Sequence, residues 1–201
     1  MTAPALVLLA ALAVAAGVLA RDRLAIGSVR ARQFSVPRGR AADGVRYSFT
    51  TAFLPWAKES ASGHLVTYLA GIVYHAGIFT MLAGLVLSLF PLALPAEAAL
   101  PLAVLFGAAL ACGLGLLLKR RLAPLLRAIS VPDDVIANLL VDAALAAALV
   151  AALAPGALPL LQLVGAALLL YAPLGKLRHM LFLVTARRLW GEFYGRRGVR
   201  G

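Results

Sequence analysis

The apolar residues of this chain fall into five long runs, separated by connections that are short or polar. The runs cover approximately residues 3–20, 64–91, 99–118, 135–153 and 157–186. They are rich in Ala, Leu and Val and lack the period-two alternation of a lipid-facing strand. Because a helix needs about 20 apolar residues to cross a bilayer, each run is long enough for one crossing. The pattern predicts an all-α membrane protein with five transmembrane helices.

The positive charges are confined to alternate connections. All 19 lysines and arginines lie in residues 21–63, in residues 119–127 and from residue 176 to the end of the chain. The connections near 90–98 and at 154–156 carry none. Basic residues mark the cytoplasmic side of a membrane protein. We therefore predict a multi-pass protein of the cytoplasmic (inner) membrane, with its N-terminus outside and its C-terminus in the cytoplasm.

This topology divides the chain into segments. They are a first transmembrane helix (1–20), a basic cytoplasmic or interfacial loop (21–63), a four-helix membrane domain (64–190) and a basic cytoplasmic tail (191–201). The net charge of +11 follows from the segregated loops, so no nucleic-acid partner is expected. The single cysteine, Cys112, excludes a disulfide framework and a cysteine-ligated iron–sulfur or zinc site.

Two histidines occupy matching settings inside the apolar runs. His75 follows Gly71 by four residues, and His179 follows Gly175 by four residues. A glycine one turn away leaves room for a bulky group beside the imidazole. A histidine within the bilayer is a functional hypothesis by default, and two on different spans are what a bis-histidine b-type haem requires. The alternative is that each imidazole hydrogen-bonds a neighbouring helix carbonyl.

Other polar side chains extend this hypothesis. Lys176 and Arg178 flank His179, where they suit anionic haem propionates or serve as ordinary membrane anchors. His64, with Lys58 and Glu59, is a possible quinone or proton site near the cytoplasmic interface. His64 could equally lie in the headgroup region without a specific role.

Further positions in the spans carry structural predictions. Asp142 is expected either to serve a proton path or to pair with an arginine of the cytoplasmic rim. Pro173 is expected to kink the fifth helix before His179. Gly77 and Gly84 are typical of helix-packing positions. Residues 130–134, Ser-Val-Pro-Asp-Asp, form a helix-start signal for the fourth span.

Several short sequences occur together over residues 64–190. They are Tyr74-His75-Ala76-Gly77-Ile78, Leu118-Lys119-Arg120-Arg121 with Pro124 and Arg127, Pro132-Asp133-Asp134, and Leu174-Gly175-Lys176-Leu177-Arg178-His179. In these the chain resembles the gamma subunit of respiratory nitrate reductase, the membrane cytochrome b that oxidises quinol. It also resembles the relatives of that subunit in heterodisulfide-reductase-like and dissimilatory sulfite-reduction complexes. The predicted five-helix topology with an outer N-terminus is similar too.

The resemblance implies how haem would be held. Members of this family hold two haems between their second and fifth spans, and the cytoplasm-side haem maps onto His75 and His179. The outer haem would need histidines at two positions that are occupied here by Leu85 and Leu161. We therefore expect one haem b and do not expect a second.

These observations lead to a functional hypothesis. The chain would be a membrane cytochrome b subunit that carries electrons between the quinone pool and a cytoplasmic iron–sulfur or flavin partner. Nothing in it is suited to reduce a soluble substrate alone, so it would be an electron-transfer subunit of a quinol-linked oxidoreductase complex. The alternative is a cofactor-free membrane anchor or assembly subunit of a respiratory or redox complex, which the same topology and basic face would serve.

Overall fold

The computed structural model describes residues 2–26, 36–57, 59–91 and 95–199, apart from the side chains of Glu59 and Ser60. Within these residues every regular element is a helix. The helices long and apolar enough to cross a membrane are Ala3–Ile26, Leu65–Leu87, Ala96–Leu122 and Pro132–Leu153, and a broken pair, Pro155–Tyr171 with Lys176–Arg196, gives a fifth if it forms one span. The predicted multi-pass helical membrane protein is confirmed at this level. The orientation of the termini stays a prediction.

The chain divides into two compact units. Unit 1 comprises Met1–Val18 and Leu69–Leu177, and unit 2 comprises Leu19–Tyr68 and Arg178–Gly201. The last helix therefore groups with the polar connection after the first span, whereas the predicted division placed most of it in the 64–190 membrane domain. Each unit has its own packing and is described separately.

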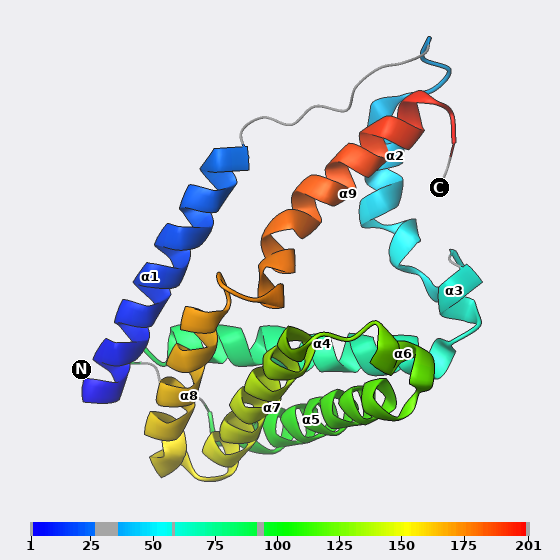
Figure 1. The fold of residues 1–201 in the computed structure, drawn as a ribbon. Coiled ribbons are helices and arrows are strands. Elements are labelled where there is room, and N and C mark those ends of the chain that lie inside the picture. The colour runs from blue at the N-terminus through cyan, green and yellow to red at the C-terminus, as the bar shows by residue number, and fades with distance from the viewer. Residues whose placement is uncertain (1, 27–35, 58, 92–94, 200–201) are drawn as a thin grey trace. The chain divides into compact units, whose positions relative to one another are not determined.

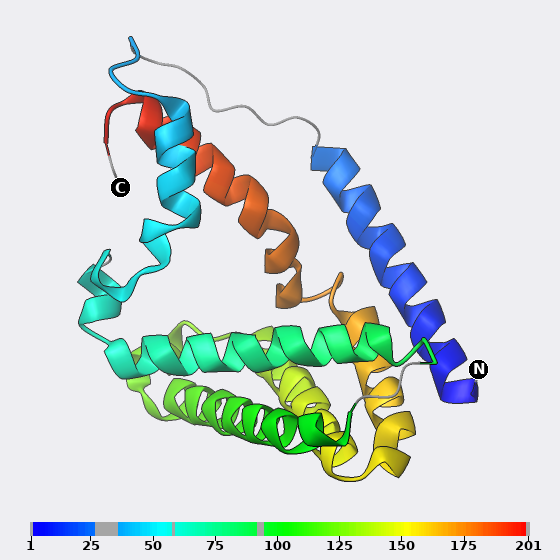
Figure 2. The same cartoon turned by 180° about the vertical axis from the view of Figure 1, so that it is seen from behind.

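Unit 1 is a bundle of apolar helices. Its elements are the first part of α1 (Ala3–Ile26), most of α4 (Leu65–Leu87), η3 (Ala96–Ala98), α5 (Ala99–Leu122), α6 (Pro124–Ala128), α7 (Pro132–Leu153), η4 (Pro155–Ala157) and α8 (Leu158–Tyr171). Helix α7 packs on both α5 and α8, as both ribbon views show (Figures 1 and 2). Small side chains lie inside this bundle, where Ala109 of α5 and Ala144 of α7 are completely buried.

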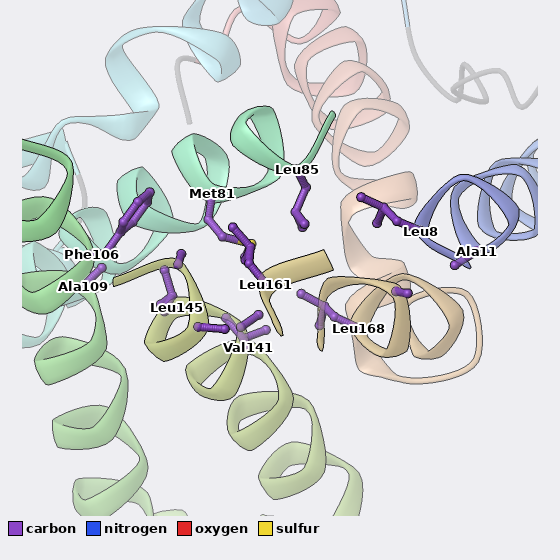
Figure 3. Close-up of a cluster of buried hydrophobic side chains, with 14 of the residues drawn as sticks. Leu8, Ala11, Met81, Leu85, Phe106, Ala109, Val141, Leu145, Leu161 and Leu168 are labelled. Carbon is purple, nitrogen blue, oxygen red and sulfur yellow. The ribbon is translucent and has the colours of Figure 1, made fainter. Parts of the chain in front are cut away.

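A cluster of larger apolar side chains fills the centre of unit 1 (Figure 3). Leu8 of α1, Met81 and Leu85 of α4 and Leu145 of α7 are each at most 2 % exposed. Leu85 lies against α8, since a Cβ added at Gly165 would come within 2.6 Å of the Leu85 side chain. The side chain of Leu85 thus fills the space between α4 and α8.

The two glycines expected at helix contacts behave differently. A methyl group at Gly77 would overlap the side chain of Ala109 on α5, so Gly77 permits close approach of α4 and α5. Around Gly84, no atom of the described residues outside its own helix turn lies within 4 Å of the same hypothetical methyl group. The packing prediction is confirmed for Gly77 and is wrong for Gly84.

The start of α7 follows the predicted signal. Pro132 is its first residue, where a missing N–H loses no helical hydrogen bond. The amide of Val131 donates to Asp134 Oδ2 at 2.9 Å, which satisfies one backbone donor at the helix start. The Ser130 hydroxyl donates to the carbonyl of Leu126 at 2.6 Å, and the residue at the cap position is Val131.

The fifth apolar run is two helices instead of one. Helix α8 ends at Tyr171, and a short helix, η5 (Lys176–Arg178), precedes α9 (His179–Arg196). Pro173 has no N–H to continue the ladder, and the amides of Leu174 and Gly175 both donate back to the Tyr171 carbonyl, at 2.9 and 3.1 Å. The expected kink at Pro173 is therefore a complete break.

Unit 2 is built on a close contact between α2 (Ala41–Phe49) and α9. The two helices lie side by side in both ribbon views (Figures 1 and 2). Gly191 and Gly195 of α9 make this possible, because a Cβ at Gly195 would lie 2.7 Å from the Arg40 carbonyl oxygen. The Ser48 hydroxyl then donates to the Arg187 carbonyl at 2.9 Å. Short elements complete the unit: η1 (Thr51–Phe53), η2 (Pro55–Ala57) and α3 (Glu59–Ser62).

We expect Gly77→Ala to lower the thermal stability of the detergent-solubilised protein. The added methyl group would overlap Ala109, and overpacking of a close contact costs about 1–3 kcal/mol. The measurement is the midpoint of thermal unfolding followed by loss of helical circular dichroism.

Gly84→Ala is the matched control, because it makes the same change in the same helix where there is open space. It should leave the midpoint unchanged or raise it, since alanine is favoured over glycine in a helix interior by roughly 0.5–1 kcal/mol. An equal loss of stability in both variants would contradict the contact at Gly77.

Candidate functional site

His75 lies in the middle of α4 with its side chain exposed. Its Nδ1 is 2.7 Å from the carbonyl oxygen of Gly71, one turn earlier. Because a carbonyl can only accept, Nδ1 carries the proton, and in the neutral imidazole Nε2 keeps its lone pair. A hydrogen bond of this kind is the usual second contact of a metal-bound histidine, since it fixes the tautomer and the ring orientation.

The surroundings of His75 are aromatic and open. The ring centroid of Phe79 lies 6.1 Å from that of His75, and nothing lies within 4 Å of a Cβ added at Gly71. The space predicted beside His75 is therefore present. The alternative prediction is that each imidazole hydrogen-bonds a helix carbonyl. Nδ1 of His75 makes such a bond, to a carbonyl of its own helix, and Nε2 remains available as a ligand.

His179 has a different setting. It is the first residue of α9, is exposed, and belongs to unit 2, whereas His75 belongs to unit 1. The space at Gly175 is used by a neighbouring side chain, because a Cβ there would overlap the ring of Tyr171. The structure thus assigns Gly175 a packing role, and the pairing of His75 with His179 stays a prediction.

The two basic residues beside His179 also differ from each other. Lys176 Nζ lies 2.6 Å from Asp134 Oδ1, an oxygen that Arg120 approaches at 3.6 Å. Arg178 is exposed at the start of α9. Lys176 therefore ties the end of the α8 segment to the start of α7, and a role for either residue with propionates stays a prediction.

Further contacts strengthen this tie between α7 and the segment after α8. The Tyr171 hydroxyl donates to the Asp133 carboxylate, and the Lys176 amide donates to Asp133 Oδ2 at 2.8 Å. The second bond satisfies a backbone donor that the break before η5 would otherwise leave without a partner. The acidic pair at the start of α7 thus holds the end of the neighbouring helix.

The possible quinone or proton site is described only in part. His64 is exposed, and its carbonyl accepts the Tyr68 amide at 3.0 Å where α4 begins. Lys58 lies outside the described residues, as does the side chain of Glu59. The grouping of these three residues stays a prediction.

A polar cluster lies inside unit 1, next to the buried Tyr74 of α4 and away from the exposed His75 side chain. Asp142 of α7 is only 4 % exposed. The Tyr74 hydroxyl donates to its Oδ1 at 2.8 Å, and the Asn138 amide donates to its Oδ2 at 2.7 Å. No arginine among the described residues forms an ion pair with Asp142, so the carboxylate is held by neutral donors.

Gly113 of α5 makes room for this cluster. A Cβ at that position would overlap both the Asp142 carboxylate and the Tyr74 ring. Its carbonyl also accepts from Asn138 at 3.4 Å. Three helices therefore share one hydrogen-bonded group, and no buried side-chain polar atom in the described part of the chain lacks a partner.

Sequence reasoning identified Asp142 but missed Tyr74, Asn138 and Gly113 as its partners. One signal was available, because Asn138 and Asp142 are four residues apart and so share a face of α7. The cluster fixes the rotation of α4, since Tyr74 points inward and the next residue, His75, points outward. No group of three or more His, Cys, Asp or Glu side chains suited to a metal ion occurs among the described residues.

We expect Asp142→Leu to destabilise unit 1 by about 1–3 kcal/mol, because it leaves the hydroxyl of Tyr74 and the amide of Asn138 without their main acceptor. Tyr74→Phe should cost less, since Asp142 keeps its bond to Asn138. The triple variant Tyr74→Phe, Asn138→Leu, Asp142→Leu should cost less than the sum of the single changes. Thermal unfolding in detergent measures all of these, and additive losses would argue against a shared network.

Comparison with known protein families, with curated proteins and with solved structures gives no match to this chain. The resemblance to membrane cytochromes b therefore stays an interpretation of the sequence motifs, and a function has to be argued from the residues themselves.

Proposed function

We propose that this multi-pass membrane protein is a cytochrome b subunit that carries electrons between the quinone pool and a cytoplasmic iron–sulfur or flavin partner. One haem b would be held by His75 and His179 as axial ligands. The subunit would act within a quinol-linked oxidoreductase complex and would not turn over a soluble substrate by itself.

The observation that carries this proposal is the state of His75. An exposed imidazole in a candidate membrane span is unfavourable unless something binds it. Its Nδ1 already donates to the Gly71 carbonyl, so the atom left to be satisfied is Nε2. A lone pair on Nε2 suits a metal ligand, and the open space at Gly71 suits a flat group beside the ring.

The residues of this chain would hold and orient such a group. His75 and His179 would hold the haem, which would supply one-electron chemistry when bound. The Gly71 carbonyl fixes the orientation of the His75 ring, and Tyr74 fixes the rotation of α4 by its bond to Asp142. In a bilayer, the apolar surroundings of α4 would keep water away from such a group, and exclusion of water is a further means by which a protein sets a haem potential.

A reduced-minus-oxidised optical spectrum, with haem quantified per chain, tests the proposal. We expect a low-spin b-type spectrum at about one haem per chain. His75→Ala and His179→Ala should each abolish it, because each removes one axial ligand. His64→Ala is the matched control and should leave the spectrum unchanged.

Loss of haem in the His64→Ala variant would refute the ligand assignment. No haem in protein that is folded and was expressed with haem available would refute the cytochrome function itself. Helical circular dichroism and a single peak in size-exclusion chromatography establish that each variant is folded.

A second candidate is a cofactor-free membrane anchor or assembly subunit. The observation that favours it is at the other histidine, where Tyr171 fills the space at Gly175 and Lys176 is bound to Asp134. In this function those residues serve helix packing alone. It predicts that His75→Ala and His179→Ala leave both the stability and the assembly with a partner subunit close to wild type.

A further inference from the structure

Unit 2 contains a cavity of about 580 Å³ between α2 and α9. This volume falls within the range of pockets that hold small molecules, roughly 300–1,000 Å³. One wall carries Tyr47 and Ala52, and the other carries Ala186, Trp190 and Tyr194. The lining is mainly apolar and aromatic, so a fitting occupant has an apolar body.

The cavity belongs to a unit that continues into a candidate membrane span. Unit 2 includes the first turn of α4, residues 65–68, and α4 is a candidate span. The Tyr68 hydroxyl in this turn donates to the carbonyl of Phe53 in η1, next to the cavity residue Ala52. One wall of the cavity is therefore attached to the end of a membrane span, where lipid headgroups lie.

Arg187 adds a positive charge to the lining. Its Nη1 donates to the Ser48 carbonyl at 2.9 Å, and its guanidinium carbon lies 4.1 Å from the centre of the Phe53 ring. Among the described residues no carboxylate forms an ion pair with Arg187, whereas its neighbour Arg188 pairs with Glu192 at 2.8 Å. Among the described side chains, the charge of Arg187 is thus held in place by neutral groups.

We propose that this cavity binds an anionic phospholipid from the surrounding membrane. An acyl chain would lie against the apolar lining, and the phosphate would pair with Arg187. Anionic lipids gather where basic residues face a membrane surface, and arginines outnumber carboxylates among the described side chains of unit 2. Tryptophan and tyrosine rings, as at Trp190, favour this same boundary between lipid and water.

The two tryptophans of the chain allow a direct test. Trp190 lines the cavity and Trp56 does not, so Trp56→Phe leaves a reporter inside the cavity and Trp190→Phe leaves one outside it. Each full-length variant is reconstituted in phosphatidylcholine vesicles. One set of vesicles contains a small fraction of brominated phosphatidylglycerol, and a second set contains the same fraction of brominated phosphatidylcholine. The bromine atoms quench the fluorescence of nearby tryptophan.

We expect the brominated anionic lipid to quench Trp190 more strongly, with an apparent preference of about fivefold, the size expected for one basic residue at a membrane surface. Trp56 should be quenched equally by the two lipids. Arg187→Gln should remove the preference at Trp190, and the matched control Arg188→Gln should retain it, because Arg188 already pairs with Glu192.

A second variant separates lipid binding from folding, since Arg187→Gln also loses the contacts with Ser48 and Phe53. Ala186→Phe keeps the charge and fills the cavity, so it should reduce quenching of Trp190 by both lipids. Equal quenching of Trp190 by the two lipids in the Trp56→Phe protein would overturn the proposal. A preference that survives both Arg187→Gln and Ala186→Phe would overturn it as well.

Discussion

A carboxylate inside a membrane-spanning bundle has to find its hydrogen-bond partners within the protein, because lipid offers none. Asp142 meets this requirement by accepting one bond from Tyr74 on α4 and one from Asn138 on its own helix. The contact is possible only because Gly113 of α5 has no side chain. A rotation of α4 would break the bond to Tyr74, so the carboxylate fixes which face of α4 is buried. The exposure of His75, and with it the case for a cofactor, depends on this arrangement.

Small residues allow helices to pack closely in both units. The hydrophobic effect contributes little to helix association in lipid, so helices gain stability mainly by close packing and by hydrogen bonds. In unit 1 the approach of α4 to α5 depends on Gly77, and in unit 2 the approach of α2 to α9 depends on Gly191 and Gly195. In unit 2 the close approach also brings a polar contact within reach, the bond from the Ser48 hydroxyl to a carbonyl of α9. The packing and the hydrogen bonds are therefore coupled.

Features local to one helix could be predicted from the sequence, and features that depend on two helices mostly could not. Hydropathy located the apolar runs, and the proline and acidic residues at 130–134 located the start of α7. Helices that are apolar on every side give no periodic signal for the packed face, so Gly77 and Gly84 could not be told apart. Gly175 illustrates the same limit, because its neighbour in space is Tyr171 of the preceding turn and not the histidine that follows it. The spacing of Gly191 and Gly195 did carry a packing signal, since small residues four apart share one helix face.

The break at Pro173 changes how the fifth crossing is made. Lys176 binds Asp134, and Tyr171 binds Asp133, so the end of α8 lies level with the start of α7. If α7 crosses the bilayer, the segment Pro155–Tyr171 beside it spans a comparable depth. The length of this segment is at the lower end of what a crossing requires. Helix α9, by contrast, carries charged side chains that pair with each other, as Arg188 does with Glu192. The break therefore separates an apolar helix, α8, which belongs to unit 1, from α9, which carries more charged side chains and belongs to unit 2.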